Sequence, residues 1–453
     1  MEGELLMLYV VKRDGRTVEF NIDKISNAIK KAATEEGVSL KTSQVFDCVQ
    51  KVINYIEMTE KENISVEEVQ NLVEKALRDS GHENIAISYS TYRKERTKVR
   101  EIKSDLMKAI QQIGYETDRD NANVGNNFSS KLLRIASESN KWHTLASMPK
   151  KLAKAHETGD LYYHDLDSYN LTTNCLHIPT REVLEKGFNT GYGTINSPKR
   201  IETAAELSCI LLQSTQNDMF GGQSHPDFDN DLGIFVEPTR KEIKKELEEL
   251  GVPSERIEGI LEKKVTERIH QAMQGVVFNL NTMHSRAGSQ VPFSSVNIGI
   301  PNSDDAALVC EIFLEEYEKG LGKGEQPIFP NIIFRVKEGV NREEGDPYYY
   351  LYELACRVAA KRMNPTFMNI DADFNKEYYD KGYMPATMGC RTYLMKNVNG
   401  EPGCKGRGNI APTTINLPRI GLQAKGDIDK FFELFQQRID LAEEALMHRY
   451  GIL

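Results

Sequence analysis

Cysteine is scarce and scattered in this chain. Only 7 cysteines occur among 453 residues, and no Cys-x-x-Cys pair is present. An odd number of isolated cysteines argues against a disulfide framework, so we expect a protein of the reducing cytoplasm. A structural zinc site needs paired ligands of that kind, so we expect no metal site within these residues.

Long apolar runs and long basic runs are also absent. No stretch approaches 18 apolar residues, and the first residues lack the basic region and small-residue cleavage site of a signal peptide. The formal net charge is -10, which disfavours double-stranded nucleic acid as a partner. With 40% hydrophobic and 27% charged residues, the composition is typical of a globular protein with neither a membrane nor a nucleic-acid partner.

Residues 1–105 have the pattern of a small α+β domain, and we expect residues 106–453 to form a second, larger domain. Two short apolar segments, Met7–Val11 and Thr17–Phe20, flank an Asp-Gly turn signal and predict a β-hairpin. The apolar residues that follow have helical spacing. Asp23 is the expected N-cap of the first helix, and Ser65 with Glu68 forms an expected capping box. The expected helices are 23–33, 41–55, 65–80 and one from about residue 85 to residue 100.

This first region resembles the ATP-cone, a small domain that binds adenine nucleotides as an activity switch. The resemblance implies an effector site for ATP or dATP. Its residues would be Val11, Lys12, Arg13, Asp14, Gly15 and Lys24. Three of these side chains are cationic, which suits a triphosphate. A basic hairpin alone is often merely solvated, but the helices that follow and Tyr92–Lys94 complete the pattern.

Three segments between residues 160 and 280 have less specific patterns. A His beside two Asp residues in His164–Asp167 could indicate a metal or acid–base site, but the spacing fits no standard ligand set, so we expect a hydrogen-bonded turn. Gln213–Pro226 is rich in amides, hydroxyls and glycines and predicts a loop that lines a polar pocket. Charged helices are expected at 238–250 and 254–272. Their charged side chains predict a solvated face that could contribute to a dimer surface.

Strands and helices alternate after residue 281. Alternation of this kind predicts parallel strands with helical crossovers, with catalytic residues at the strand ends. The expected strands are 294–300, 328–335, 365–369 and 386–394, with helices at 303–319 and 347–363.

Cys390 lies within the last of these segments, between turn-rich sequences. Gly389 leaves space beside it for a substrate, because glycine has no side chain. A free cysteine is often only a small buried hydrophobe. Cys175 follows a polar run and is a candidate second thiol that the fold could bring close to Cys390.

Several motifs in order resemble class III, anaerobic ribonucleoside-triphosphate reductase. They are Asn174–His177, Gln216–Gln223, Met388–Thr392, Gly406–Asn409 and Thr414–Arg419. Together with the ATP-cone pattern they extend over essentially the whole chain.

The resemblance implies a ten-stranded α/β barrel around a finger loop, and reduction of ribonucleoside triphosphates to 2′-deoxyribonucleoside triphosphates. Cys390 would carry the thiyl radical that abstracts the 3′ hydrogen of the ribose. Cys175 would deliver a proton or hydrogen as the 2′ hydroxyl leaves. Thr392 stands where aerobic relatives have a glutamate, which implies formate as reductant with Asn409 as its contact. The closed barrel would shield the radical.

The resemblance also implies partners and cofactors. The family carries its stable radical on a C-terminal glycine that follows a zinc site with two Cys-x-x-Cys pairs, and neither occurs in these 453 residues. We therefore expect the glycyl radical and zinc in a further segment, and a chain that by itself binds nucleotides without turnover. An S-adenosylmethionine iron–sulfur activating enzyme, deoxyribonucleotide specificity effectors and a second copy of the chain are the expected partners.

Two alternatives remain open. A pyruvate formate-lyase-like glycyl-radical enzyme would share the barrel, but such enzymes lack the ATP-cone and favour adjacent cysteines on the loop. A non-catalytic ATP-cone sensor would keep the nucleotide site alone.

Overall fold

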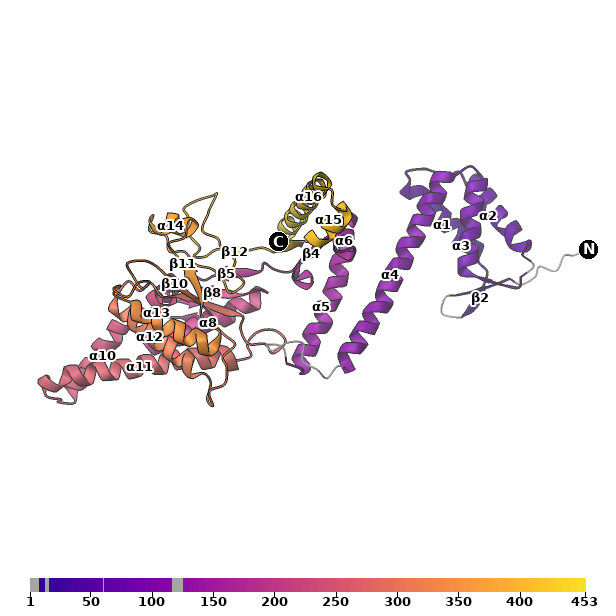
Figure 1. Cartoon of the computed structure of the whole chain (residues 1–453). Helices are drawn as coiled ribbons and strands as arrows, with labels where there is room; N and C mark the ends of the chain where they lie inside the picture. The colour runs from indigo at the N-terminus through magenta and orange to yellow at the C-terminus, as the bar shows by residue number, and fades with distance from the viewer. Residues whose placement is uncertain (1–7, 13–15, 60, 116–124) are drawn as a thin grey trace, which may run out of the picture. The chain divides into compact units, whose positions relative to one another are not determined.

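The computed structural model describes residues 8–12, 16–59, 61–115 and 125–453, and it divides into two compact units, Met1–Ala109 and Ile110–Leu453 (Figure 1). In the first unit, β1 lies between β2, with which it pairs antiparallel, and β3, with which it pairs parallel. Its elements are β1 (Tyr9–Val11), β2 (Thr17–Glu19), α1 (Ile22–Glu35), α2 (Thr42–Glu57), β3 (Asn63–Ser65), α3 (Val66–Asp79) and α4 (Glu83–Tyr115).

The first unit has a hydrophobic core of its own, drawn from one face of each helix and from β1 and β3, with Ile29, Val52, Ile64 and Leu77 among its members. The capping box of Ser65 and Glu68 is confirmed at the start of α3. Asp23 as N-cap is wrong, because Asn21 precedes the helix and its Oδ1 accepts from Lys24 N at 3.3 Å. Helix α4 continues to Tyr115, beyond its expected end near residue 100.

The second unit is built on a six-stranded sheet in the order β11-β10-β9-β8-β5-β12. Five strands run parallel, and β12 pairs antiparallel with β5. The strands are β5 (Cys175–His177), β8 (Gln223–His225), β9 (Ser294–Ile298), β10 (Asn331–Val336), β11 (Thr366–Asn369) and β12 (Gly408–Asn409). The predicted α/β class is confirmed. The largest sheet of the described residues has six strands and is open, so its closure into ten strands stays a prediction.

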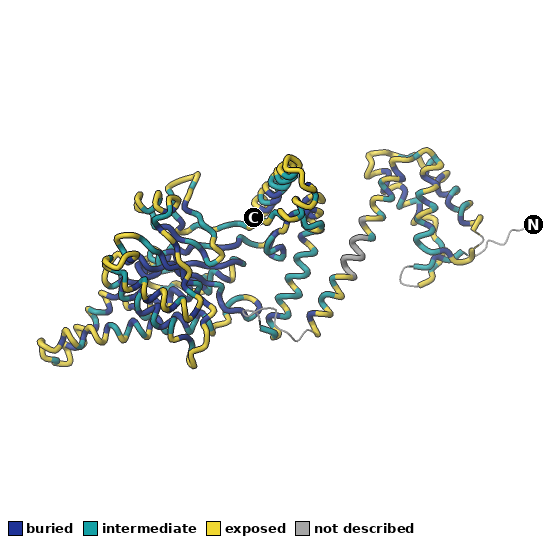
Figure 2. Tube along the Cα trace, viewed as in Figure 1, coloured by how far each residue is buried: buried dark blue, intermediate teal, exposed yellow. Residues whose placement is uncertain are grey.

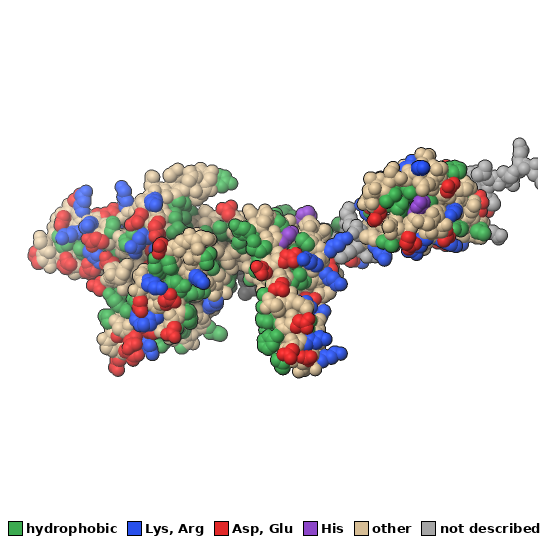
Figure 3. All heavy atoms as spheres, turned by 90° about the horizontal axis from the view of Figure 1, so that it is seen from above, with side chains coloured by type: hydrophobic (Ala, Val, Ile, Leu, Met, Phe, Trp, Pro, Cys, Tyr) green, Lys and Arg blue, Asp and Glu red, His purple; other side chains and the backbone are tan. Residues whose placement is uncertain are grey.

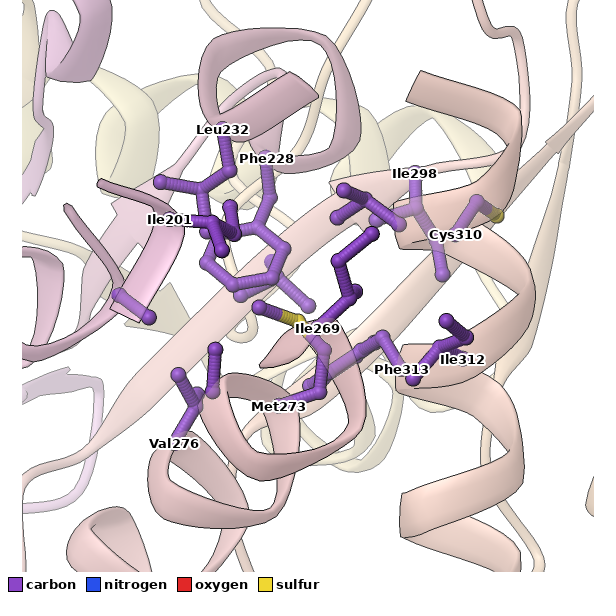
Figure 4. Packing of buried hydrophobic residues seen from close by; sticks show 14 of the residues in the cluster. Ile201, Phe228, Leu232, Ile269, Met273, Val276, Ile298, Cys310, Ile312 and Phe313 are labelled. Atoms are coloured by element: carbon purple, nitrogen blue, oxygen red, sulfur yellow. The ribbon is translucent and has the colours of Figure 1, made fainter. Parts of the chain in front are cut away.

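Helices cover one face of this sheet, because alternate strand residues on that face are apolar. Val296, Ile298, Ile332 and Phe334 belong to the hydrophobic cluster on this face. Figure 4 shows Ile298 among helix residues of the same cluster, such as Cys310 and Ile312. The cluster also contains Phe228 and Phe313, whose ring centroids lie 5.2 Å apart. The covering helices are α8 (Ile201–Asp218), α9 (Phe228–Gly233), α10 (Val236–Glu249), α11 (Ser254–Thr282), α12 (Asp304–Lys319) and α13 (Tyr349–Arg362).

The opposite face of the sheet is polar but equally buried. Strand register places Cys175, His177, Ser295 and Asn297 on this face, and all four side chains are buried. Figure 2 shows in dark blue the buried segments that run through the middle of this unit. Burial lowers the pKa of His177 to about 3, so the ring is neutral. The sheet therefore separates a packing face from a face that can hold polar chemistry.

The remaining elements lie before, between and after the strands of this sheet along the chain. Tyr163, Tyr169 and Ala445 share a smaller hydrophobic cluster that joins the start and the end of the unit. These elements are α5 (Phe128–Ser147), α6 (Lys150–Glu157), β4 (Leu161–Tyr163), η1 (Leu166–Ser168), α7 (Thr180–Lys186), β6 (Phe188–Asn189), β7 (Thr194–Ile195), α14 (Asp373–Tyr379), β13 (Thr413–Ile415), α15 (Leu417–Ala424) and α16 (Ile428–Ile452).

Two sequence predictions for this unit are wrong. The strand expected at 386–394 is a loop held by a single bridge between Thr387 and Tyr393, and its tip is a turn. The loop expected at 213–226 begins as the last turns of α8 and ends as β8, because amide and hydroxyl side chains are compatible with both elements when they are buried.

The surface carries interspersed charges. Lys and Arg side chains lie beside Asp and Glu side chains over the face seen in Figure 3. The expectation that α11 is merely solvated holds for only one of its sides, because Ile269 and Met273 on the other side belong to the core. No helix within the described ranges is both long enough and apolar enough to span a bilayer.

Candidate active site and effector pocket

Cys390 lies in a tight turn at the tip of the loop. The turn is closed by Arg391 N, which donates to Met388 O at 2.7 Å, and by Met388 N, which donates to Thr392 O at 3.2 Å. Gly389 and Cys390 are its central residues, and Arg391 has a φ of 69°. The loop therefore presents an exposed cysteine from a backbone that is fixed on both sides.

The fold brings Cys175 to this turn. The two Sγ atoms lie 3.6 Å apart, although Cys175 comes from β5 and Cys390 from the loop. Gly222 N donates to Cys175 Sγ at 3.2 Å, and Thr392 Oγ1 lies 3.1 Å from Cys390 Sγ. The hydrogen bond to Cys390 and burial raise the pKa of the Cys175 thiol, so Cys175 keeps its proton and can donate it.

Asn409 joins the two cysteines into one constellation. Its Oδ1 accepts from Cys175 N at 2.9 Å, and its Nδ2 donates to Thr392 Oγ1 at 3.2 Å. Antiparallel pairing places it directly opposite Cys175. The structure thus brings together all three predicted catalytic residues, Cys390, Cys175 and Asn409, around Thr392.

Glycines allow this close approach. A Cβ atom on Gly221 would lie 2.6 Å from Cys175 Sγ and 2.0 Å from Asn174 Oδ1. A Cβ atom on Gly408 would lie 2.0 Å from the backbone oxygen of Cys175. Both values are far below normal contact distances, so any larger side chain would displace β5, the loop before β8 or β12.

The histidine and aspartates expected at a turn lie near the site without forming a metal centre. His164 Nε2 lies 2.7 Å from Thr414 Oγ1. Asp165 has a φ of 53°, and burial followed by the charge of Asp167 raises its pKa. No group of three or more metal-ligating side chains occurs in the part of the chain that the structure describes.

Three residues near the loop were missed by sequence reasoning. Ser295 and Asn297 hold the loop against β9, and they lie in a run that indicates only a strand. Arg286 Nη2 donates to Phe220 O at 2.6 Å, and its guanidinium is close enough to Asp165 and Cys175 to interact with them electrostatically. Arg286 stands in a short loop, where no periodicity identifies it.

The first unit contains a separate pocket of ≈ 940 Å³ between α1, α3 and α4. Its lining combines cations with two tyrosines, and burial raises the pKa of Tyr89 to about 12. The cationic and aromatic side chains that line it include Lys24, Lys30, Lys31, Tyr89, Tyr92 and Arg96. The neighbouring Arg93 is held by Glu67 and Glu74 at 3.1 and 2.6 Å.

Only part of the predicted effector site coincides with this pocket. Lys24 lines it, whereas Val11 ends β1 and Lys12 N donates to Arg16 O at 2.8 Å, and neither is among the lining residues. Arg13, Asp14 and Gly15 lie outside the described residues. Lys30 and Lys31 of α1 were not expected to contribute, because surface lysines on an amphipathic helix are usually solvated.

Comparison with known proteins finds a matching family model for each of the two units. Residues 8–98 match the ATP cone domain, and residues 120–453 match the family model of the anaerobic ribonucleoside-triphosphate reductase. The chain is 31% identical to the anaerobic ribonucleoside-triphosphate reductase of Escherichia coli K12 across 98% of its length, and 30% identical to that of Enterobacteria phage T4 across 77%. It spans 63% of the length of the first relative and 59% of the second.

The fold has a counterpart among solved structures. The anaerobic ribonucleotide reductase from Thermotoga maritima, solved in complex with dATP and CTP, superposes with a TM-score of 0.53 at 18% sequence identity. The alignment covers 78% of this chain and 61% of that one, and at this identity it shows the fold alone. The sequence matches do more, and they establish that this chain belongs to the anaerobic ribonucleoside-triphosphate reductase family.

Proposed function

We propose that this chain supplies the thiol chemistry and the nucleotide switch of an anaerobic ribonucleoside-triphosphate reductase. The observation that carries the proposal is the 3.6 Å distance between Cys175 Sγ and Cys390 Sγ, with Asn409 and Thr392 bonded to both sides of the pair. The sulfur of Cys390 would take the 3′ hydrogen of the ribose. Cys175, which keeps its proton, would protonate the departing 2′ hydroxyl, and Cys390 would then return its hydrogen to C3′.

Formate is the reductant that this arrangement favours. A ribonucleotide loses its 2′ hydroxyl as water with two electrons and two protons; oxidation of formate to carbon dioxide supplies both electrons and one proton, and solvent supplies the other. Asn409 and Thr392 offer an amide and a hydroxyl beside the two sulfurs, and both can hydrogen-bond a small carboxylate. Because residue 392 is a threonine, no side-chain carboxylate at that position would repel formate.

The pocket of the first unit is the effector site in this proposal. Lys24, Lys30, Lys31 and Arg96 supply positive charge for a triphosphate, and Tyr89 with Tyr92 supplies aromatic surface for adenine. ATP and dATP would bind here, and deoxyribonucleotide specificity effectors elsewhere.

The thiyl radical on Cys390 would be formed by a glycyl radical, which an S-adenosylmethionine iron–sulfur enzyme would generate. The chain would also associate with a second copy of itself as a homodimer. All seven cysteines are free, which supports a reducing cytoplasmic location.

The proposal is tested with enzyme prepared anaerobically from its native cells and activated with the iron–sulfur enzyme, using CTP, ATP and formate. Conversion to dCTP is measured by chromatography. Cys390→Ser should abolish conversion while ATP binding is unchanged, because the exchangeable S–H bond is lost and the effector pocket is untouched. Cys356→Ser, at an exposed cysteine on α13, should retain full conversion.

Other outcomes would separate the alternatives. Full conversion by Cys390→Ser would exclude Cys390 as the radical cysteine. Absence of conversion in the activated wild-type enzyme, with ATP binding retained, would instead favour a nucleotide sensor. Conversion that proceeds equally without formate would remove formate from the mechanism and leave the thiol pair in place.

A further inference from the structure

We propose that Asn297 and Ser295 of β9 are positioning residues that hold Cys390 opposite Cys175. Their importance for catalysis rests on the proposed function, whereas their role in holding the loop against the sheet does not. Both side chains are buried, at 0% and 1% exposure, and both lie on the polar face of the sheet. Neither contacts the sulfurs directly; each acts through the backbone of the finger loop, residues 386–394.

Asn297 binds the loop at two atoms of one residue. Its Oδ1 accepts from Thr387 N at 3.0 Å, and its Nδ2 donates to Thr387 O at 2.9 Å. This is the pattern that a neighbouring strand would provide, supplied here by one side chain. Nδ2 also faces Ser224 Oγ at 3.3 Å and His225 O at 3.4 Å, which fixes the orientation of the amide.

Ser295 binds the loop two residues further on. Its Oγ accepts from Gly389 N at 3.0 Å. Gly389 lies so close to the sheet that a Cβ atom there would be 2.9 Å from Asn331 Nδ2 and 3.4 Å from Ser295 Cβ. Thr387, just before the turn, and Gly389, within it, are thus tied to alternate residues of β9, and this attachment leaves Cys390 little freedom.

The distance between the sulfurs is sensitive to this attachment. Hydrogen transfer needs near-contact geometry, and a displacement of about 1 Å can cost about 100-fold in rate. A shift of the loop along β9 would move Cys390 away from Cys175, which is anchored separately by β5, β8 and β12.

Isosteric variants can break each contact, and the chain supplies a matched control for each. Asn297→Asp keeps the acceptor for Thr387 N but replaces the donor by a carboxylate oxygen that repels Thr387 O. Asn341→Asp makes the same change at a fully buried asparagine that donates to Gly299 O and Arg335 O, away from the loop. Ser295→Ala removes the acceptor for Gly389 N. Ser294→Ala alters the adjacent buried serine, whose Oγ has no partner in the described structure.

The test uses the protein of all 453 residues, reduced and anaerobic, without substrate or activation. Diamide oxidises Cys175 and Cys390 to a disulfide: the S–S bond forms, and the azo group takes up two electrons and two protons. The cross-linked peptide is quantified by mass spectrometry over time. We expect Asn297→Asp to form it at least about 10-fold more slowly, Ser295→Ala more slowly by a smaller factor, and both controls at the wild-type rate.

A folded Asn297→Asp protein that cross-links at the wild-type rate would overturn the proposal, as would an equal slowing in Asn341→Asp. In activated enzyme, Asn297→Asp should lower kcat about 100-fold and leave KM for CTP nearly unchanged, because the loop positions the sulfur rather than the nucleotide. Absence of turnover in the wild type would count against the proposed function, yet the cross-linking result would still decide the positioning role.

Discussion

Asp231 is a fully buried carboxylate whose two oxygens accept no hydrogen bond within the described structure. Its nearest cations are Arg181, with Nε at 3.5 Å, and Lys405, with Nζ at 3.8 Å. Burial raises the pKa of Asp231 to about 7, and these two cations only partly offset that effect. The folded protein therefore binds this proton more tightly than the unfolded chain, in which the pKa is near 3.8.

This difference in pKa predicts a loss of stability on raising the pH. Since the folded-state pKa is the higher one, the contribution of Asp231 falls between about pH 4 and about pH 7. Asp231→Asn should remove this fall and make the protein more stable than wild type by about 2 kcal/mol at pH 8, with little difference at pH 4. Urea unfolding at several pH values measures the effect.

Asp380→Asn is the control, because Asp380 is exposed and its nearest cation, Lys376, lies 3.9 Å away. It should change stability by less than about 0.5 kcal/mol at any pH. A stability difference between Asp231→Asn and wild type that is constant from pH 4 to pH 8 would contradict the buried-charge account.

At the residue scale, sequence motifs pointed to Cys390, Cys175 and Asn409 as catalytic residues. The structure places these three residues together, and their catalytic roles stay a prediction. Asn297 could not be found in this way, because asparagine in a strand has many roles and its partner is the backbone of Thr387. Asp231 was missed for a related reason: only the folded chain shows that both of its oxygens are buried.

The short pairing of β12 with β5 is the element on which the site geometry depends. It involves only Gly408 opposite Leu176 and Asn409 opposite Cys175. Gly408→Ala should separate these strands, because the new Cβ would lie 2.0 Å from Cys175 O. We expect a loss of about 1–3 kcal/mol in stability and slower Cys175–Cys390 cross-linking, measured by thermal unfolding and by the diamide reaction.

Gly421→Ala provides the contrast within the same part of the chain. Gly421 lies in α15, and a Cβ atom there meets nothing within 4 Å. It should be neutral or stabilising by up to about 1 kcal/mol, because alanine is the better helix former. Equal effects of the two substitutions would show that β12 does not need a glycine.

Element prediction was most reliable where burial and periodicity agree. The central strands β9 and β10 and the helices α12 and α13 were all expected within a few residues of their bounds. The finger loop was misread as a strand because Ala386–Leu394 is rich in apolar and β-branched residues. Apolar residues of this segment pack in the loop instead, where Ala386 is buried against Met395 and Cys404, which follow the loop.

At the scale of the whole molecule, the chain consists of two units with separate hydrophobic cores. All core residues of the first unit lie between Val10 and Tyr89, so residues 1–115 contain everything that this core needs. We expect this fragment to fold cooperatively and to bind ATP at the pocket of α1 and α4. Circular dichroism and isothermal titration calorimetry test folding and binding separately.

The cations of the pocket should control this binding. Lys31→Ala should weaken ATP binding about 10-fold, because one charge-assisted contact to phosphate is worth about 1.5 kcal/mol. Lys61→Ala, at a surface ion pair with Glu68 outside the pocket, should leave the affinity unchanged. Equal affinities of all three proteins would place the effector site elsewhere, with the predicted residues of the hairpin as the next candidates.

The two faces of the sheet in the second unit have a consequence for how this protein tolerates sequence change. Residues that stabilise the fold, such as Val296 and Phe334, alternate along the same strands with residues that hold the loop, such as Asn297. Neighbouring codons therefore come under different selection. A mutational scan that scores protein abundance and growth separately should therefore show an alternating pattern along β9. Changes at positions 296 and 298 should reduce the protein level. Changes at positions 295 and 297 should reduce growth at a normal protein level.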